Sequence, residues 1–205
     1  MAILLPALGA ARATARGIKC RAQLRDMALV HYDYFFQNGK VLPVSIKDPK
    51  VQPWFVLDEF RKGLDLEPLD YEYKHRHAGQ LQEYKPSYPK KFICPDASYA
   101  LEHPEDGLYP FERSYGVNVH NYDQRISIQT YVKRSPAERI CLADAMDYWF
   151  HCWTCDVYSQ TPERWLGFET YGSAAFRHRG KANVAYWDGH CEALTAEQLK
   201  YKLDH

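Results

Sequence analysis

Residues 2–36 constrain the fold of this chain most, because they favour a single long helix. The stretch is rich in alanine, the best helix former, and Pro6 lies in the first turn, where a missing backbone N–H costs little. At about 1.5 Å per residue the helix would be roughly 50 Å long, well beyond the usual length of about three to four turns. Gln37-Asn38-Gly39 then gives a strong signal for its C-terminal end.

The predicted helix changes character along its length. It opens with apolar residues and then turns basic, with no acidic residue before Asp26. Arg12, Arg16 and Lys19 share one face, which we expect to be solvated. A second stripe, with spacings of four and three residues, is expected to face a core and consists of Cys20, Leu24, Met27, His31 and Tyr34.

Length and charge limit the remaining possibilities. At 205 residues the chain fits one domain with an extended element, and we divide it into the helix at 1–37 and a globular head at 38–205. Its formal net charge is zero, which gives no electrostatic case for a nucleic-acid partner. The 16 tyrosines, nine phenylalanines and five tryptophans can build a sizeable core, and they also suggest half-exposed aromatic surface.

The sequence of the head predicts an α+β fold in which the long helix packs on an antiparallel sheet with long loops. Alternating segments predict strands at 114–118 and 125–133, and two further strands are predicted at 182–187 and 190–194. Asp188-Gly189 predicts a two-residue hairpin turn, and Thr195 with Gln198 predicts a capping box that opens a terminal helix. Residues 54–64 have roughly helical spacing, and 145–170 read as an aromatic insertion.

Five blocks, in chain order, resemble bacterial type IV pilin-like proteins. The similarity is to the pseudopilin-like group with a prepilin-type cleavage and methylation segment and a C-terminal H-x9-D-G motif. The blocks are residues 2–8 with 13–18, 20–24 and 34–43; Phe92-Ile-Cys-Pro95; Ser114-Tyr-Gly-Val-Asn118; residues 135–144; and His178 followed after nine residues by Asp188-Gly189.

The resemblance implies a pilin-like fold, with a buried strand at 140–144 that ends in Asp144. It also implies a structural subunit of a type II secretion or type IV pilus-like assembly, without enzyme activity. Its implied partners are other pilin-like subunits, bound through the N-terminal helix. A complete apolar segment would also anchor the helix in the inner membrane, with a periplasmic or extracellular head.

The N-terminus departs from the family pattern. Members begin with a cleaved Gly-Phe junction, a nearby glutamate and a longer apolar run, whereas here only eleven residues precede Arg12 and a spanning helix needs about twenty. We expect an N-terminally shortened form of a pilin-like protein. The alternatives are a signal peptide ending near residues 11–13, and a soluble helix whose apolar end packs on its own domain.

His178, Asp188 and Gly189 are the motif residues, and the favoured interpretation is architectural. Gly189 would supply a positive φ, Asp188 would bind turn amides, and His178 would satisfy a buried backbone group. The alternative adds Asp144, at the end of a predicted strand, so that Asp144, His178 and Asp188 gather as a metal site. Calcium needs six to eight oxygens, and these residues offer few, with Asn183 as a further candidate.

The six cysteines leave several pairings open. Cys152 and Cys155 form a C-x2-C pair that, with Cys141 and Cys191, is a candidate zinc site or disulfide. A disulfide between Cys20 and Cys94 would clamp the helix to the head, and the alternative is two buried free thiols.

No nucleotide-binding or hydrolase motif is present in the sequence, so we predict no enzyme and no required cofactor, with calcium or zinc as the metal alternatives. Two other functions stay open. The first is an envelope-exposed binding module that uses Tyr- and Trp-rich loops, and the second is a metal-binding protein at the sites named above.

Overall fold

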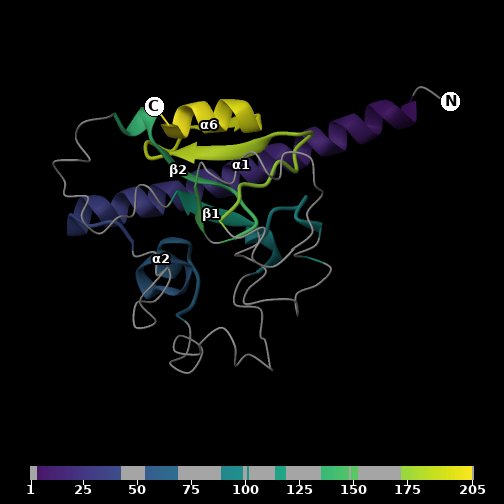
Figure 1. The fold of residues 1–205 in the computed structure, drawn as a ribbon. Coiled ribbons are helices and arrows are strands. Elements are labelled where there is room, and N and C mark those ends of the chain that lie inside the picture. The colour runs from purple at the N-terminus through teal and green to yellow at the C-terminus, as the bar shows by residue number, and fades with distance from the viewer. Residues whose placement is uncertain are drawn as a thin grey trace.

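The computed structural model describes residues 4–42, 54–68, 89–98, 101, 114–118, 135–147, 149–151 and 172–204 (Figure 1). Its helices are α1 (Leu4–Asn38), α2 (Asp58–Gly63) and α6 (Ala196–Asp204). Its strands are β1 (Tyr115–Asn118), β2 (Ile140–Asp144), β3 (Trp149–Phe150), β4 (Ala182–Tyr186) and β5 (Cys191–Leu194). The predictions for 125–133, for most of 65–91 and for most of 145–170 lie outside the described residues.

Helix α1 confirms the prediction of one long N-terminal helix. It ends where Gly39, with φ of 63°, donates its N–H to the Phe35 carbonyl at 2.8 Å. The predicted stripe is buried, except that Tyr34 is half-buried, while Arg12, Arg16 and Lys19 are exposed. Within the described chain, no helix combines the length and the apolar character needed to cross a membrane.

The two parts of α1 differ in their surroundings. We call residues 6–16 the projecting segment, because their side chains are exposed apart from half-buried Ala13 and the helix extends past the sheet here (Figure 1). We call residues 17–38 the packed segment, because the buried stripe lies here, against β4, β2 and β5. Among the described residues, two polar contacts tie the projecting segment to the head: Arg179 donates to the Ala10 carbonyl at 2.9 Å, and Arg16 contacts Asp96.

The five strands form one mixed sheet in the order β3-β1-β2-β4-β5. All neighbouring pairs are antiparallel except β1 and β3, which are parallel, with Val117 opposite Trp149. The prediction of a wholly antiparallel sheet was therefore wrong at this edge, although the α+β class holds. Strand β3 lies within the predicted aromatic insertion and has only two residues, too few to show any periodic pattern.

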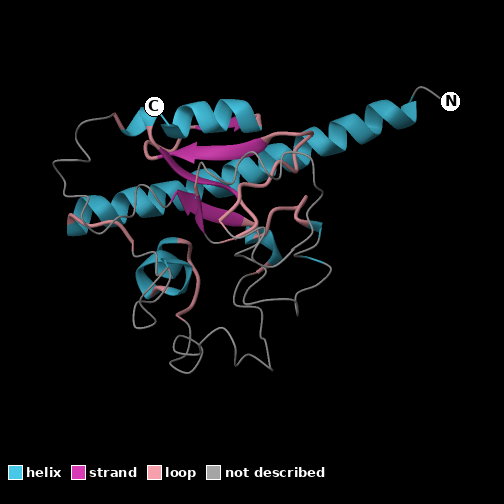
Figure 2. Ribbon diagram, viewed as in Figure 1, coloured by secondary structure: helices cyan, strands magenta, loops and turns pink. Residues whose placement is uncertain are grey.

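The sheet lies between two helical layers (Figure 2). On one face the packed segment of α1, together with α2 and Trp54, covers the larger apolar core. On the other face, α6 inserts Leu199 beside Tyr186 and Leu194. Residues 54–64, predicted as one short helix, divide into a 3-10 turn at Trp54–Val56 and α2.

The β4–β5 hairpin is present, but its turn is longer than predicted. Gly189 donates to the Tyr186 carbonyl at 2.9 Å and Tyr186 donates to the His190 carbonyl at 2.9 Å, so the loop has three residues, 187–189. Gly189 has φ of 85°, as expected for its left-handed position. The capping box is confirmed, since Gln198 N–H donates to Thr195 Oγ1 and Thr195 N–H donates to Gln198 Oε1.

Candidate functional site

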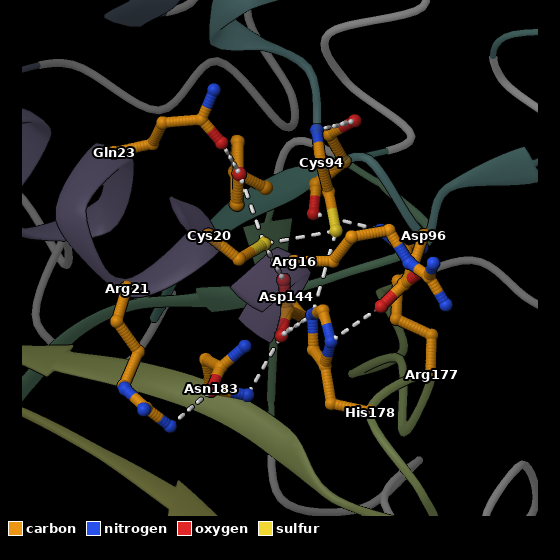
Figure 3. A network of polar contacts seen from close by, with 12 residues as sticks. Arg16, Cys20, Arg21, Gln23, Cys94, Asp96, Asp144, Arg177, His178 and Asn183 are labelled. Atoms are coloured by element: carbon orange, nitrogen blue, oxygen red, sulfur yellow. Dashed lines mark hydrogen bonds and ion pairs between the residues drawn. The ribbon is translucent and has the colours of Figure 1, made fainter. Parts of the chain in front are cut away.

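Four buried or nearly buried side chains from four separate segments meet beside α1 (Figure 3). They are Cys20 on α1, Cys94 after the 3-10 turn Lys90–Phe92, Asp144 at the end of β2, and His178 before β4. Their candidate ligand atoms all lie within 4.8 Å of one another. In the described part of the chain, no other set of three or more such side chains gathers in this way.

The contacts within the cluster form a closed ring. Cys20 Sγ lies 2.9 Å from Cys94 Sγ and 3.2 Å from Asp144 Oδ1. His178 Nε2 lies 3.4 Å from Cys94 Sγ and 3.2 Å from Asp144 Oδ2. Each of the four side chains therefore faces two others, and the same edge of the imidazole meets both a sulfur and a carboxylate.

Local structure explains how each side chain reaches the cluster. Cys20 lies on the buried stripe of α1, and the backbone N–H of Cys94 donates to Ser114 Oγ at 3.2 Å. Asp144 is fixed from the neighbouring strand, because the Asn183 N–H donates to its Oδ2 at 2.7 Å. His178 begins a tight turn in which its backbone exchanges two hydrogen bonds with Lys181.

A second layer of polar groups surrounds the cluster. His178 Nδ1 lies 2.9 Å from Asp96 Oδ2, and Asp96 in turn contacts Arg16. On the other side, the Tyr115 hydroxyl lies 3.1 Å from Cys20 Sγ and donates to Gln23 Oε1 at 2.6 Å. These contacts hold the orientation of the imidazole and of the Cys20 sulfur.

Burial and mutual contact shift the ionisation of the cluster strongly. Burial, together with the hydrogen bond to Cys94, raises the pKa of the Cys20 thiol. Burial opposes ionisation of Cys94, but hydrogen bonds with Cys20 and His178 lower its pKa to about 6. Burial also opposes a charge on His178, yet hydrogen bonds with Asp144 and Cys94 raise its pKa to about 10. These shifts favour a thiolate at Cys94 and an imidazolium at His178 over the neutral pair.

Two chemical uses suit this set of side chains. Cys94, His178 and Asp96 have the connectivity of a nucleophile, a base and an orienting carboxylate. However, Cys94 is 0% exposed, and a nucleophile must reach its substrate. The second use is metal binding, because two sulfurs, an imidazole nitrogen and a carboxylate oxygen are all zinc ligands.

No protein-family model matches this chain, and no curated protein or solved structure is significantly similar to it. The resemblance to pilin-like proteins therefore rests on the sequence blocks alone.

The structure combines two groups that the sequence left separate. Cys20 and Cys94, predicted as a disulfide or as free thiols, are free and buried, and they lie beside Asp144 and His178. His178 was expected to satisfy a buried backbone group; among the described residues, its ring contacts the side chains of Asp96, Asp144 and Cys94.

Asp188 stays apart from this cluster. It lies in the hairpin turn, where Oδ1 accepts from the His190 N–H at 3.1 Å and lies 2.6 Å from His190 Nδ1. The structure thus does not bring Asp188 to Asp144 and His178 as a metal site, and the architectural interpretation of Asp188 and Gly189 agrees with their contacts.

The other cysteine predictions find less support. Neither Cys141 nor Cys191 belongs to a metal-binding group among the described residues, and Cys152 and Cys155 lie outside those residues. Asn183 enters the cluster through its backbone N–H to Asp144. Trp149, which lies within the predicted insertion, is buried and therefore does not contribute to the exposed aromatic surface proposed there.

Sequence reasoning missed Asp96 and Tyr115 as partners of the cluster. One signal was available: Cys20 lies on the apolar stripe of the helix, so its thiol had to face the head. The identity of the facing groups depends on tertiary contacts and had no local signal.

Proposed function

We propose that this chain is a structural, pseudopilin-like subunit of a type II secretion or type IV pilus-like assembly in the bacterial envelope. The observation that carries the proposal is the division of α1. The packed segment belongs to the core of the head, whereas the projecting segment extends past the sheet with exposed side chains (Figure 1). A helix arranged in this way can join a neighbouring subunit without unfolding the head.

The composition of the projecting segment supports helix-to-helix contact. The exposed residues at its start are apolar or small, and they are Pro6, Ala7, Leu8, Gly9, Ala10 and Ala11. Leu8 is 49% exposed, so the isolated chain leaves apolar helix surface in water. Packing against another such helix would bury that surface, and small side chains allow two backbones to approach closely.

The assembly follows from repeating one contact. A head-to-tail interface whose rotation does not close gives a helical filament. Projecting segments of this chain and of other pilin-like subunits would form the filament core, and the heads would face outward. In a form with a complete apolar segment, the helix would lie in the inner membrane before assembly, with the head on the periplasmic or extracellular side.

Site-specific photocrosslinking in cells that carry the assembly tests this proposal. A benzophenone amino acid is placed at Leu8 on the projecting segment, and in a matched variant at Tyr201, which is 65% exposed on α6. We expect the Leu8 variant to crosslink to α1 of another copy, or to the N-terminal helix of another pilin-like subunit, as mapped by mass spectrometry. The Tyr201 variant should give no such product.

Equal crosslinking at Leu8 and Tyr201, or a Leu8 variant that stays monomeric under illumination, would contradict the proposal. A crosslink from Leu8 into the head of its own chain would instead support the interpretation in which the apolar end packs on its own domain.

A further inference from the structure

We propose that Cys20, Cys94, Asp144 and His178 bind a single zinc ion, as a structural site that clamps α1 to the head. This inference goes beyond assembly, because it concerns how each subunit holds its own helix. All four ligands belong to one subunit and lie C-terminal to the projecting segment, so the proposal does not require contact between subunits.

The donor set matches zinc better than the other common cations. Structural zinc sites are four-coordinate and take cysteine sulfur, histidine nitrogen and carboxylate oxygen. Calcium and magnesium prefer six or more oxygens, and the cluster offers one carboxylate. Two thiolates also favour a thiophilic metal over a hard one.

The spacing of the four donors fits a tetrahedral ion after a small opening. Zinc–ligand bonds of about 2.0–2.3 Å place neighbouring donors roughly 3.3–3.8 Å apart. The contacts of Asp144 with Cys20 and of His178 with Cys94 and Asp144 span 3.2–3.4 Å, close to this range. The two sulfurs, at 2.9 Å, would have to separate by somewhat less than 1 Å.

A disulfide would use only part of this arrangement. The sulfurs of Cys20 and Cys94 lie 2.9 Å apart, between the bonded distance of about 2.05 Å and the separation that a shared zinc ion needs, and both cysteines are free. A disulfide would also leave Asp144, which is fully buried, without a thiol partner. A divalent cation gives both thiolates and the carboxylate a counter-charge in the interior, where an unpaired charge is costly.

The surrounding polar groups are those that metal ligands need. His178 presents Nε2 to the cluster, while Nδ1 faces Asp96, the carboxylate–histidine–metal arrangement that orients a ligating imidazole. Asp144 accepts from the Asn183 backbone, and the Tyr115 hydroxyl reaches the Cys20 sulfur. All four coordination positions are supplied by the protein, which is typical of a structural site rather than a catalytic one.

Metal analysis of the reduced, untagged full chain tests the proposal directly. We expect one zinc ion per chain in the wild type, and loss of that zinc in Cys94→Ser and His178→Asn. Cys191→Ser is the matched control: this half-buried cysteine lies outside the cluster, and its substitution should leave the zinc content unchanged. Asp96→Asn should keep the site but weaken zinc affinity by about 10–100-fold, because it removes the orienting contact.

Two measurements on the wild type keep the test decisive if a ligand variant fails to fold. A strong chelator should lower the thermal unfolding midpoint, and added zinc should restore it. Cobalt replacement should give the thiolate charge-transfer band and the intense visible bands of a tetrahedral site with sulfur ligands.

Purified wild type without bound zinc, a Cys20–Cys94 disulfide in its mass spectrum, or Cys94→Ser that retains full zinc would each overturn the site. None of these results depends on crosslinking at Leu8, so the zinc proposal and the assembly proposal can fail separately.

Discussion

The projecting and packed segments of α1 are one continuous helix with opposite environments. Residues 6–16 expose nearly all their side chains, whereas the stripe on residues 17–38 includes four fully buried side chains, those of Cys20, Leu24, Met27 and His31. Near the start of the packed segment lies the cluster of Cys20, Cys94, Asp144 and His178. Counted from the N-terminus, the cluster is thus the first buried polar contact between α1 and the head.

The difference shows that one helix can draw its stability from two sources. The packed segment is stabilised by burial of its apolar stripe, the usual source of helix stability in proteins. The projecting segment depends on alanine-rich helix propensity and on continuity with the packed part. The two sources of stability cannot be distinguished from the secondary structure alone, but substitutions in each segment should distinguish them.

The largest effect should come from truncating a core side chain of the packed segment. Leu24→Ala should lower the free energy of unfolding by about 2–5 kcal/mol, because it leaves a cavity among fully buried neighbours. The same truncation in the projecting segment, Leu8→Ala, should change it by at most about 0.5 kcal/mol. Chemical denaturation measures both, and equal losses would remove the distinction between the segments.

A second effect of a few kcal/mol should depend on pH. Burial lowers the pKa of His31 to about 3, among the rings of Trp54, Phe60 and Trp187. The unfolded chain binds this proton at higher pH than the folded chain, so stability is complete above about pH 6.5 and falls as the pH decreases toward 3.

Denaturation of wild type and His31→Leu at two pH values measures this effect. Between about pH 7.5 and 5 the wild type should lose about 2 kcal/mol more than the variant. An identical pH dependence in the two proteins would mean that His31 does not resist protonation and that this part of the packed segment is open to water.

The smallest effect should locate the boundary between the projecting segment and the packed segment more closely. Gly17 is buried beside His178, and an added methyl group would meet the His178 ring at an ordinary contact distance of 3.8 Å. Gly17→Ala should therefore raise the free energy of unfolding by about 0.5–1 kcal/mol through helix propensity. Gly9→Ala, with open space around it, should leave global unfolding unchanged while raising local helix content. Equal gains in global stability would place the boundary closer to the N-terminus.

Local rules predicted much of this fold. Helical spacing identified the buried stripe of α1, Gly39 marked its end, and alternation identified β1, whereas β2 was expected only from the family resemblance. The Asp188-Gly189 pair located the hairpin, although the loop has three residues because Gly189 takes the left-handed position after the first turn. The parallel pairing of β3 with β1 was not predictable, since a two-residue strand has no period and depends on a partner elsewhere in the chain.

The candidate site was only partly predictable for the same reason. Its residues were singled out as separate pairs, but the contacts that join them span from 34 positions, between Asp144 and His178, to 124 positions in the chain. No local pattern carries that information. The helix stripe fixes the direction of the Cys20 thiol, while the sheet register and the turn at His178 decide what it meets.

Amide hydrogen exchange along α1, measured at low and at high protein concentration, tests the central claim most directly. At low concentration we expect rapid exchange in residues 6–16 and slow exchange in residues 20–38. At the concentration where the chain associates, residues 6–16 should become protected while residues 20–38 stay as they were. Uniform slow exchange along the whole helix at low concentration, or association without added protection in residues 6–16, would contradict the account.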